Sequence, residues 1–174
     1  KATGYGLLLR ENGLCSIDPD KVKEARIGMA ALGFNLELLM RAGVRTRSTR
    51  TGSGGRSVFR ADGDICWIKF KSKETGTVLE LRADSENLQD VIPGLVYATR
   101  DGELCTQEYV NGKRLDDAPP LPDEFLAWWE RLSTDIDFLR DQEQRFFDAI
   151  GVKPYLSIST GKTGGVLAYP APGV

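Results

Sequence analysis

The chain has 174 residues, a formal net charge of −2, and 41% hydrophobic and 28% charged residues. A globular domain of this size can bury a core without disulfides or a structural metal, and the charge excludes a strongly basic coat for nucleic acid, though not a local basic groove. The chain contains no histidine, which excludes Ser-His-Asp and Cys-His catalysis and histidine metal ligands. Catalysis would have to rest on carboxylates, Lys, Arg, Ser, Thr or Tyr.

The cysteines and the hydropathy pattern indicate a cytoplasmic protein. Cys15, Cys66 and Cys105 are far apart and form no CxxC pair, which is typical of free thiols in a reducing compartment. No apolar run reaches the roughly 18 residues of a membrane span. The N-terminal residues lack the pattern of a signal peptide.

The first third of the chain predicts two strands and a helix. Apolar runs at residues 5–10 and 14–17 flank Asn12 and Gly13, and Asn-Gly between two such runs predicts a β-hairpin. Residues 21–41 carry apolar side chains at helical spacing. Gly33 is expected to weaken this helix or to split it in two.

The remainder predicts several strands followed by helices. We expect strands at residues 44–51, 56–60, 66–70, 77–82 and 104–110, with a turn at Pro93 and Gly94. A proline-rich connector at 117–123 leads to a helical segment at 124–150. Trp128 and Trp129 lie on its apolar stripe, where helix packing is a better explanation than base stacking. This order of elements predicts an α+β fold with a mostly antiparallel sheet.

The first candidate site consists of Asp18 and Asp20, on either side of Pro19 at the end of a predicted strand. Two carboxylates spaced in this way on extended chain point to the same side and repel each other, so they favour a cation. Mg²⁺ and Mn²⁺ prefer oxygen ligands of this kind. The alternative is an Asp turn that caps the following helix, whose N-terminus favours negative charge. These residues alone leave both interpretations open.

The second candidate is the glycine-rich segment at residues 51–56. Its glycines let backbone N–H groups approach an anion, and Ser53 and Arg56 can donate to phosphate. The segment is not a P-loop, because no Gly-Lys-Ser/Thr closes it. Judged alone, an ordinary hairpin loop is the favoured interpretation.

Two further features carry charge. Glu80 lies within an apolar strand on the same face as Val78 and Arg82; judged alone, it is better explained by a solvated face. A cluster of arginines is suited to a triphosphate or to the backbone of a nucleic acid, with a solvated strand face as the alternative. Its members are Arg41, Arg45, Arg47, Arg50 and Arg56.

Taken in chain order, these motifs resemble the primase-polymerase (Prim-Pol) domains of phage and plasmid replication proteins, members of the archaeo-eukaryotic primase superfamily. The resemblance covers roughly residues 5–130. Its motifs are residues 17–20 before a helix, the loop at 51–56, the strand at 78–82, the turn at 93–94 and the prolines at 119–122.

This resemblance implies an α+β, RRM-like core with a mixed or antiparallel sheet, flanking helices and a C-terminal helical segment. It implies that Asp18, Asp20 and Glu80 are catalytic and bind Mg²⁺ or Mn²⁺. It also implies that the incoming nucleoside triphosphate is bound by Arg50, Ser53, Gly54, Gly55, Arg56 and Ser57.

One position departs from the family. After the Gly-Gly loop, the family usually has a histidine that contacts the phosphates, and this chain has Ser57. Either Arg56, Ser53 and nearby arginines take over phosphate binding, or activity is weakened. The chain would then be a nucleic-acid-binding or origin-recognition module. Another two-metal phosphoryl enzyme, such as a nuclease, is a further alternative.

The resemblance also predicts an organisation. We expect a catalytic core at residues 1–122, a helical appendage at 123–152, and a tail at 153–174 that leads towards a further region. The expected partners are single-stranded DNA template and nucleoside triphosphates, with a fused helicase domain and no membrane. The expected location is the cytoplasm of a bacterial host cell.

Overall fold

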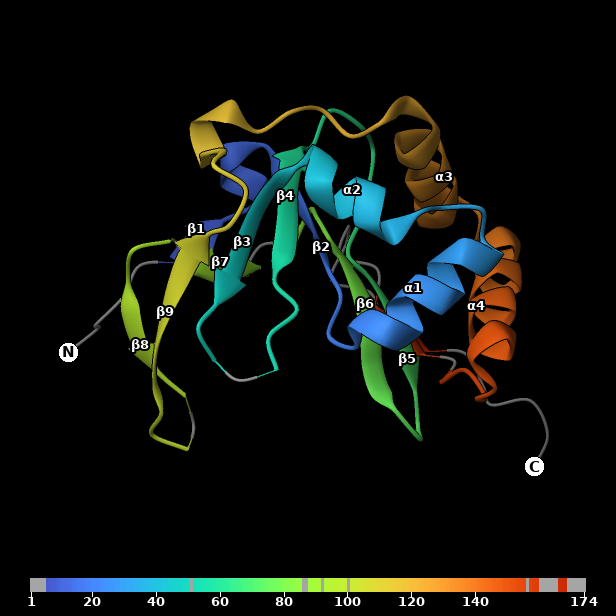
Figure 1. Cartoon of the computed structure of the whole chain (residues 1–174). Helices are drawn as coiled ribbons and strands as arrows, with labels where there is room; N and C mark the ends of the chain where they lie inside the picture. Colours follow the sequence, from blue (N-terminus) through green and yellow to red (C-terminus); the bar gives the residue numbers. More distant parts are fainter. Residues whose placement is uncertain are drawn as a thin grey trace.

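The computed structural model describes residues 6–50, 52–85, 88–91, 93–99, 101–155, 157–159 and 166–168. Its centre is a seven-stranded sheet in which each described neighbour pair is antiparallel (Figure 1). The predicted α+β class is therefore confirmed. In spatial order the strands are β5 (Ile68–Ser72), β6 (Gly76–Arg82), β2 (Leu14–Asp18), β4 (Arg56–Arg60), β3 (Val44–Ser48), β9 (Leu104–Tyr109) and β8 (Val96–Ala98).

Helices cover one face of this sheet. They are α1 (Val22–Ala31), α2 (Leu36–Ala42), α3 (Asp123–Thr134) and α4 (Ile136–Ile150). Alternate strand residues such as Ile17, Phe59 and Phe70 share one buried cluster with Met29 and Phe146 from the helices. The segment at 123–152 therefore packs into the same core as the sheet.

The two tryptophans of α3 pack as expected. Trp128 and Trp129 are both buried. The indole N–H of Trp128 donates to Gln142 Oε1 at 2.9 Å, and that of Trp129 donates to the Cys66 carbonyl at 2.9 Å. Because both rings are enclosed and their polar atoms are satisfied, neither serves as an exposed surface for base stacking.

The helix predicted at 21–41 is divided at Gly33. This residue has φ +90°, which favours glycine, and it ends α1. Asn35 then caps α2 by accepting the Leu38 N–H at 3.2 Å. A second glycine, Gly28, sets the approach of α1 to α4, because an added Cβ would collide with the Phe146 ring.

A small second sheet lies on the other face of the main sheet. It pairs β1 (Gly6–Leu8) with β7 (Gln89–Val91) in antiparallel register. Leu9 and Leu88, at its ends, pack with Leu14, Val44 and Val58 in a second buried cluster. These strand residues alternate with those under the helices, which places the β1–β7 sheet opposite the helices.

The hairpin predicted at Asn12 and Gly13 is wrong. β1 pairs with β7, whereas β2 pairs with β4 and β6. The chain between them forms a 3-10 helix at Arg10–Asn12, and Asn12 Nδ2 donates to the Leu8 carbonyl at 2.7 Å. The burial of Leu9 between the two sheets outweighs the local turn preference.

The end of the chain is described only in part. A 3-10 helix at Leu115–Asp117 precedes α3, and strands β10 (Ser157–Ser159) and β11 (Val166–Ala168) pair with each other. Most of the tail predicted at 153–174 lies outside the described residues. Within the described part of the chain, no helix combines the length and apolar character needed to cross a bilayer.

We predict that Glu143 of α4 makes the fold less stable as pH rises. Glu143 is buried, neither carboxylate oxygen has a hydrogen-bond partner, and burial raises its pKa to about 8. The unfolded chain releases this proton near the ordinary value of 4.5. The stabilising contribution is therefore complete below that pH and is lost as the pH rises to about 8.

Glu143→Gln should remove this dependence. Urea unfolding is expected to find the variant more stable than wild type by about 4 kcal/mol at pH 8, and close to it at pH 4.5. Exposed Glu108 provides the control variant Glu108→Gln, which should follow wild type. The interpretation is wrong if wild type and Glu143→Gln lose stability in parallel between these two pH values.

Candidate functional site

Strand register brings two of the predicted acidic residues together. Asp18 of β2 lies opposite Glu80 of β6, and Glu80 lies opposite Lys69 of β5. Since Ile17 faces the helices, Asp18 faces the other side of the sheet. The predicted convergence of Asp18 and Glu80 therefore occurs on the face that carries the β1–β7 sheet.

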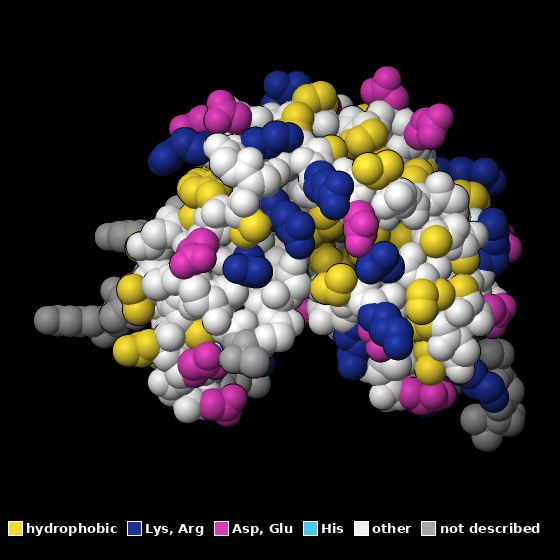
Figure 2. All heavy atoms as spheres, viewed as in Figure 1, with side chains coloured by type: hydrophobic (Ala, Val, Ile, Leu, Met, Phe, Trp, Pro, Cys, Tyr) yellow, Lys and Arg dark blue, Asp and Glu magenta, His cyan; other side chains and the backbone are white. Residues whose placement is uncertain are grey.

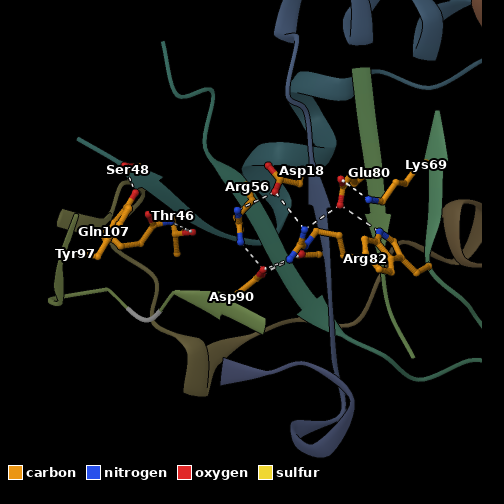
Figure 3. A network of polar contacts seen from close by, with 12 residues as sticks. Asp18, Thr46, Ser48, Arg56, Lys69, Glu80, Arg82, Asp90, Tyr97 and Gln107 are labelled. Atoms are coloured by element: carbon orange, nitrogen blue, oxygen red, sulfur yellow. Dashed lines mark hydrogen bonds and ion pairs between the residues drawn. The ribbon is translucent and has the colours of Figure 1, made fainter. Parts of the chain in front are cut away.

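Two arginines join the carboxylates of this face (Figure 3). Arg56 Nη2 lies 2.8 Å from Asp18 Oδ2, and its Nη1 pairs with Asp90 Oδ1. Arg82 Nη1 lies 2.8 Å from Glu80 Oε2 and 4.0 Å from Asp18 Oδ2, and its Nη2 lies 3.0 Å from Asp90 Oδ1. Each arginine thus connects Asp18 of β2 with Asp90 of β7.

Asp90 reaches the cluster from the small sheet. Its side chain is 5% exposed, and its Oδ2 accepts a hydrogen bond from Ser16 Oγ at 3.1 Å. The sequence gives no signal for this role, because Asp90 enters only through the pairing of β7 with β1 and the packing of that sheet on the main one.

Glu80 is held from a second side by β5 and the residues before it. Trp67 Nε1 donates to Glu80 Oε2 at 3.1 Å, and Lys69 Nζ lies 3.4 Å from Oε1. The Lys69 ammonium also lies over the Trp67 ring, 4.2 Å from its centroid. Glu80 is 8% exposed, so the solvated-face interpretation of this residue is wrong.

Burial, and to a lesser extent their mutual repulsion, disfavours the charged forms of the acidic groups. Burial raises the pKa of Asp18 to about 6, the Arg56 and Arg82 charges oppose this rise, and Asp20 and Asp90 add to it. Burial also raises the pKa of Asp20, with a further contribution from Glu80. These groups therefore favour the arrival of positive charge.

A cavity of about 300 Å³ opens next to this cluster. The molecule is hollowed beside the loop that joins β3 to β4, at the lower edge of the view in Figure 2. The cavity brings together Asp18, Asp20 and the glycine-rich loop. Its other walls come from Pro19, Ser48, Arg50, Val91, Tyr97 and Gln107.

The structure separates the predicted nucleotide-binding residues into two groups. Arg50, Ser53, Gly54, Gly55 and Arg56 all line the cavity. Ser57 does not: it is fully buried on the helix-covered face, where its Oγ donates to the Met40 carbonyl at 3.0 Å. Adjacent strand residues point to opposite faces, so Arg56, not Ser57, reaches the site. Thr51 lies outside the described residues.

Backbone contacts fix the shape of the loop. Gly55 has φ +72°, and an added Cβ would collide with the Thr46 carbonyl oxygen. Arg45 Nη2 donates to the Gly54 carbonyl at 3.4 Å. The glycines thus allow the loop to lie directly against β3, where its backbone faces the cavity beside Arg56.

Polar side chains from the far strands form the other end of the cavity. Ser48 Oγ and Tyr97 Oη are 2.5 Å apart, and Gln107 Nε2 donates to Thr46 Oγ1 at 3.1 Å. Sequence reasoning missed these residues. Their only signal is alternation along β3, β8 and β9, which does not reveal that β9 lies between the other two strands.

The acidic side chains offer the oxygen ligands that Mg²⁺ and Mn²⁺ prefer. Among the residues that the structure describes, however, no group of three or more acidic or cysteine side chains is arranged to hold a metal ion. Asp18 and Glu80 instead contact Arg56, Arg82 and Lys69. These carboxylates have the ligand chemistry for a divalent cation, but binding one would require Asp18 and Glu80 to give up these arginine and lysine contacts.

Comparison of the chain with protein-family models, curated proteins and solved structures gives no match. The resemblance to Prim-Pol domains consequently rests on the sequence motifs alone.

We predict that Gly55→Ala disrupts the loop. The new Cβ would meet the Thr46 carbonyl, so the loop must move away from β3. Polyphosphate affinity, measured by calorimetry, should fall at least about tenfold, the equivalent of about 1.4 kcal/mol. Gly52 has φ +80° but no atom near an added Cβ. Gly52→Ala therefore controls for backbone strain alone, and an equal loss in both variants would contradict the proposed contact.

We predict that Ser57→His destabilises the protein and adds no site residue. The imidazole would have to enter the packed space beside α2, where Ser57 contacts Met40. Thermal unfolding should show a midpoint lower by several degrees, consistent with overpacking that costs about 1–3 kcal/mol. Ser57→Ala, which loses only the hydrogen bond, should cost about 1 kcal/mol. A Ser57→His variant as stable as wild type would place residue 57 elsewhere.

Proposed function

We propose that this chain is the catalytic core of a DNA primase-polymerase that joins nucleotides on a single-stranded DNA template. One observation carries the proposal: the glycine-rich loop, Arg50, Arg56, Asp18 and Asp20 line a single cavity, with Glu80 paired across the sheet from Asp18. Groups suited to a triphosphate thus lie directly beside groups suited to divalent cations.

The arrangement of strands supports an RRM-like core. The run from β2 through α1 and α2 to β3 and β4 follows the order of the first four elements of a β-α-β-β-α-β unit. β2 lies between β4 and β6, and β3 lies outside β4. The second half departs from this unit, because β5, and not a helix, precedes β6.

The chain's own groups supply binding and orientation. Arg50, Arg56, Ser53 and the loop N–H groups would bind the triphosphate oxygens and offset their charge. Asp18, Asp20 and Glu80 would hold Mg²⁺ or Mn²⁺, whose chemistry at such sites is to activate the attacking 3′-hydroxyl and stabilise the leaving pyrophosphate. Trp67 and Lys69 keep Glu80 in place for this role.

Basic side chains on α1, α2 and β3 suit a template backbone. Lys and Arg side chains gather across the middle of the face in Figure 2, over α1, α2 and β3. The exposed members include Lys23, Arg26, Arg41 and Arg47. Binding through backbone charge would be independent of base sequence and strongly reduced by salt.

We further propose that the chain works in a bacterial host cell, fused to a helicase.

A second function is favoured by the arginine contacts. Asp18 and Glu80 already have cationic partners, and the chain lacks the family histidine. A Prim-Pol fold that binds single-stranded DNA without synthesis would have this combination.

Primer extension and de novo synthesis on single-stranded DNA, with Mg²⁺ or Mn²⁺ and labelled nucleotides, test the first function. Wild type should make products, and Asp18→Asn or Glu80→Gln should lose at least about a hundredfold in rate, because the metal's charge stabilisation is worth several kcal/mol. Asp62→Asn serves as a control, since Asp62 is exposed and pairs with Arg60 away from the site.

The same protein samples separate the two functions when template binding is measured by fluorescence anisotropy. Product from wild type but not from the site variants supports the polymerase. Template binding without product from any variant, in either metal, rejects the polymerase and supports the binding module.

A further inference from the structure

Arg56 belongs to two environments at once. Its guanidinium contacts Asp18 and Asp90 within the carboxylate cluster, and the same side chain lines the cavity beside the glycine-rich loop. The side chain is 23% exposed, so it can be approached from the cavity. Figure 3 shows it between Asp18 and Asp90.

The ion pair between Arg56 and Asp18 opposes the binding of both expected ligands. A phosphate that enters the cavity competes with Asp18 for the Arg56 guanidinium, and a divalent cation competes with Arg56 for the Asp18 carboxylate. Guanidinium binds phosphate as well as carboxylate through paired N–H donors. When Arg56 leaves Asp18 to bind the phosphate, Asp18 therefore becomes available to the divalent cation.

We propose that Arg56 transfers from Asp18 to the phosphate oxygens of an incoming polyphosphate, and that this transfer makes Asp18 available to a divalent cation. Polyphosphate and divalent cation then bind with positive coupling. The coupling rests on the proposed function only in naming a nucleoside triphosphate as the natural ligand; the exchange itself involves phosphate, cation and side chains.

Arg82 keeps its contacts with Glu80 and Asp90 while Arg56 changes partner. It does not line the cavity, and it lies closer to Glu80 and Asp90, at 2.8 and 3.0 Å, than to Asp18, at 4.0 Å. When Arg56 turns to phosphate, Arg82 and Ser16 still satisfy Asp90. The small sheet therefore keeps its polar attachment to the main sheet.

The first arm of the test measures binding of inorganic tripolyphosphate by calorimetry, in buffer with a chelator and no divalent metal. Asp18→Asn should bind about tenfold more tightly than wild type, within the usual range of coupling between sites. Asp20→Asn is the matched control: Asp20 lines the same cavity and carries the same charge, but in the described part of the chain it forms no ion pair with an arginine, and Arg56 and Arg82 act on it only through space. Its gain should be no more than about threefold, from charge alone.

The second arm measures Mn²⁺ binding without phosphate, by the electron paramagnetic resonance signal of free Mn²⁺. Arg56→Gln should bind Mn²⁺ about tenfold more tightly than wild type, because Asp18 loses its competing partner. Arg50→Gln is the control, since Arg50 carries the same charge at the same cavity without contacting Asp18. It should change affinity by no more than about threefold.

Equal gains for Asp18→Asn and Asp20→Asn, or no tripolyphosphate binding by wild type, would overturn the proposal. Unchanged Mn²⁺ affinity in folded Arg56→Gln would overturn it as well. Should Arg56→Gln fail to fold, as judged by circular dichroism, the first arm decides alone. A protein that shows both expected results but makes no DNA product retains the exchange and loses the polymerase.

Discussion

Charge balance on the face of the main sheet that carries the β1–β7 sheet is the constraint on which the rest of the site depends. Asp18, Glu80 and Asp90 are largely shielded from water and are held by Arg56, Arg82 and Lys69. A shielded charge that loses its partner costs about 3–5 kcal/mol, even where the pair itself adds little stability. The cluster therefore fixes the relative positions of β2, β4, β6 and β7 and places the carboxylates beside the cavity.

Local patterns were sufficient for much of this architecture. Apolar periodicity located the strands and helices, and Gly33 divided the predicted helix as expected. The period of two along a strand placed Glu80 and Arg82 on one face, where they now pair. The glycine-rich loop and the two aspartates also lie together, because the loop leads into β4, which pairs with β2, the strand that ends at Asp18.

The errors and omissions all concern long-range pairing. Asn12 and Gly13 have the residues of a hairpin turn, but the burial of Leu9 between two sheets decides the partner of β1. Asp90 has no motif, since its role exists only after β7 has packed on the main sheet. Ser57 was assigned to the site by its position in a motif, whereas the register of β4 turns it towards α2.

The attachment of β7 to β1 has a consequence for how the site can fluctuate. Asp90 reaches the cluster from a two-stranded sheet of three-residue strands, and short peripheral elements open more readily than the core to which they attach. Each local opening of this sheet would withdraw one negative charge from Arg56 and Arg82 while the seven-stranded sheet stays folded. The electrostatic potential in the cavity thus depends on how much of the time the β1–β7 sheet stays docked on the main sheet.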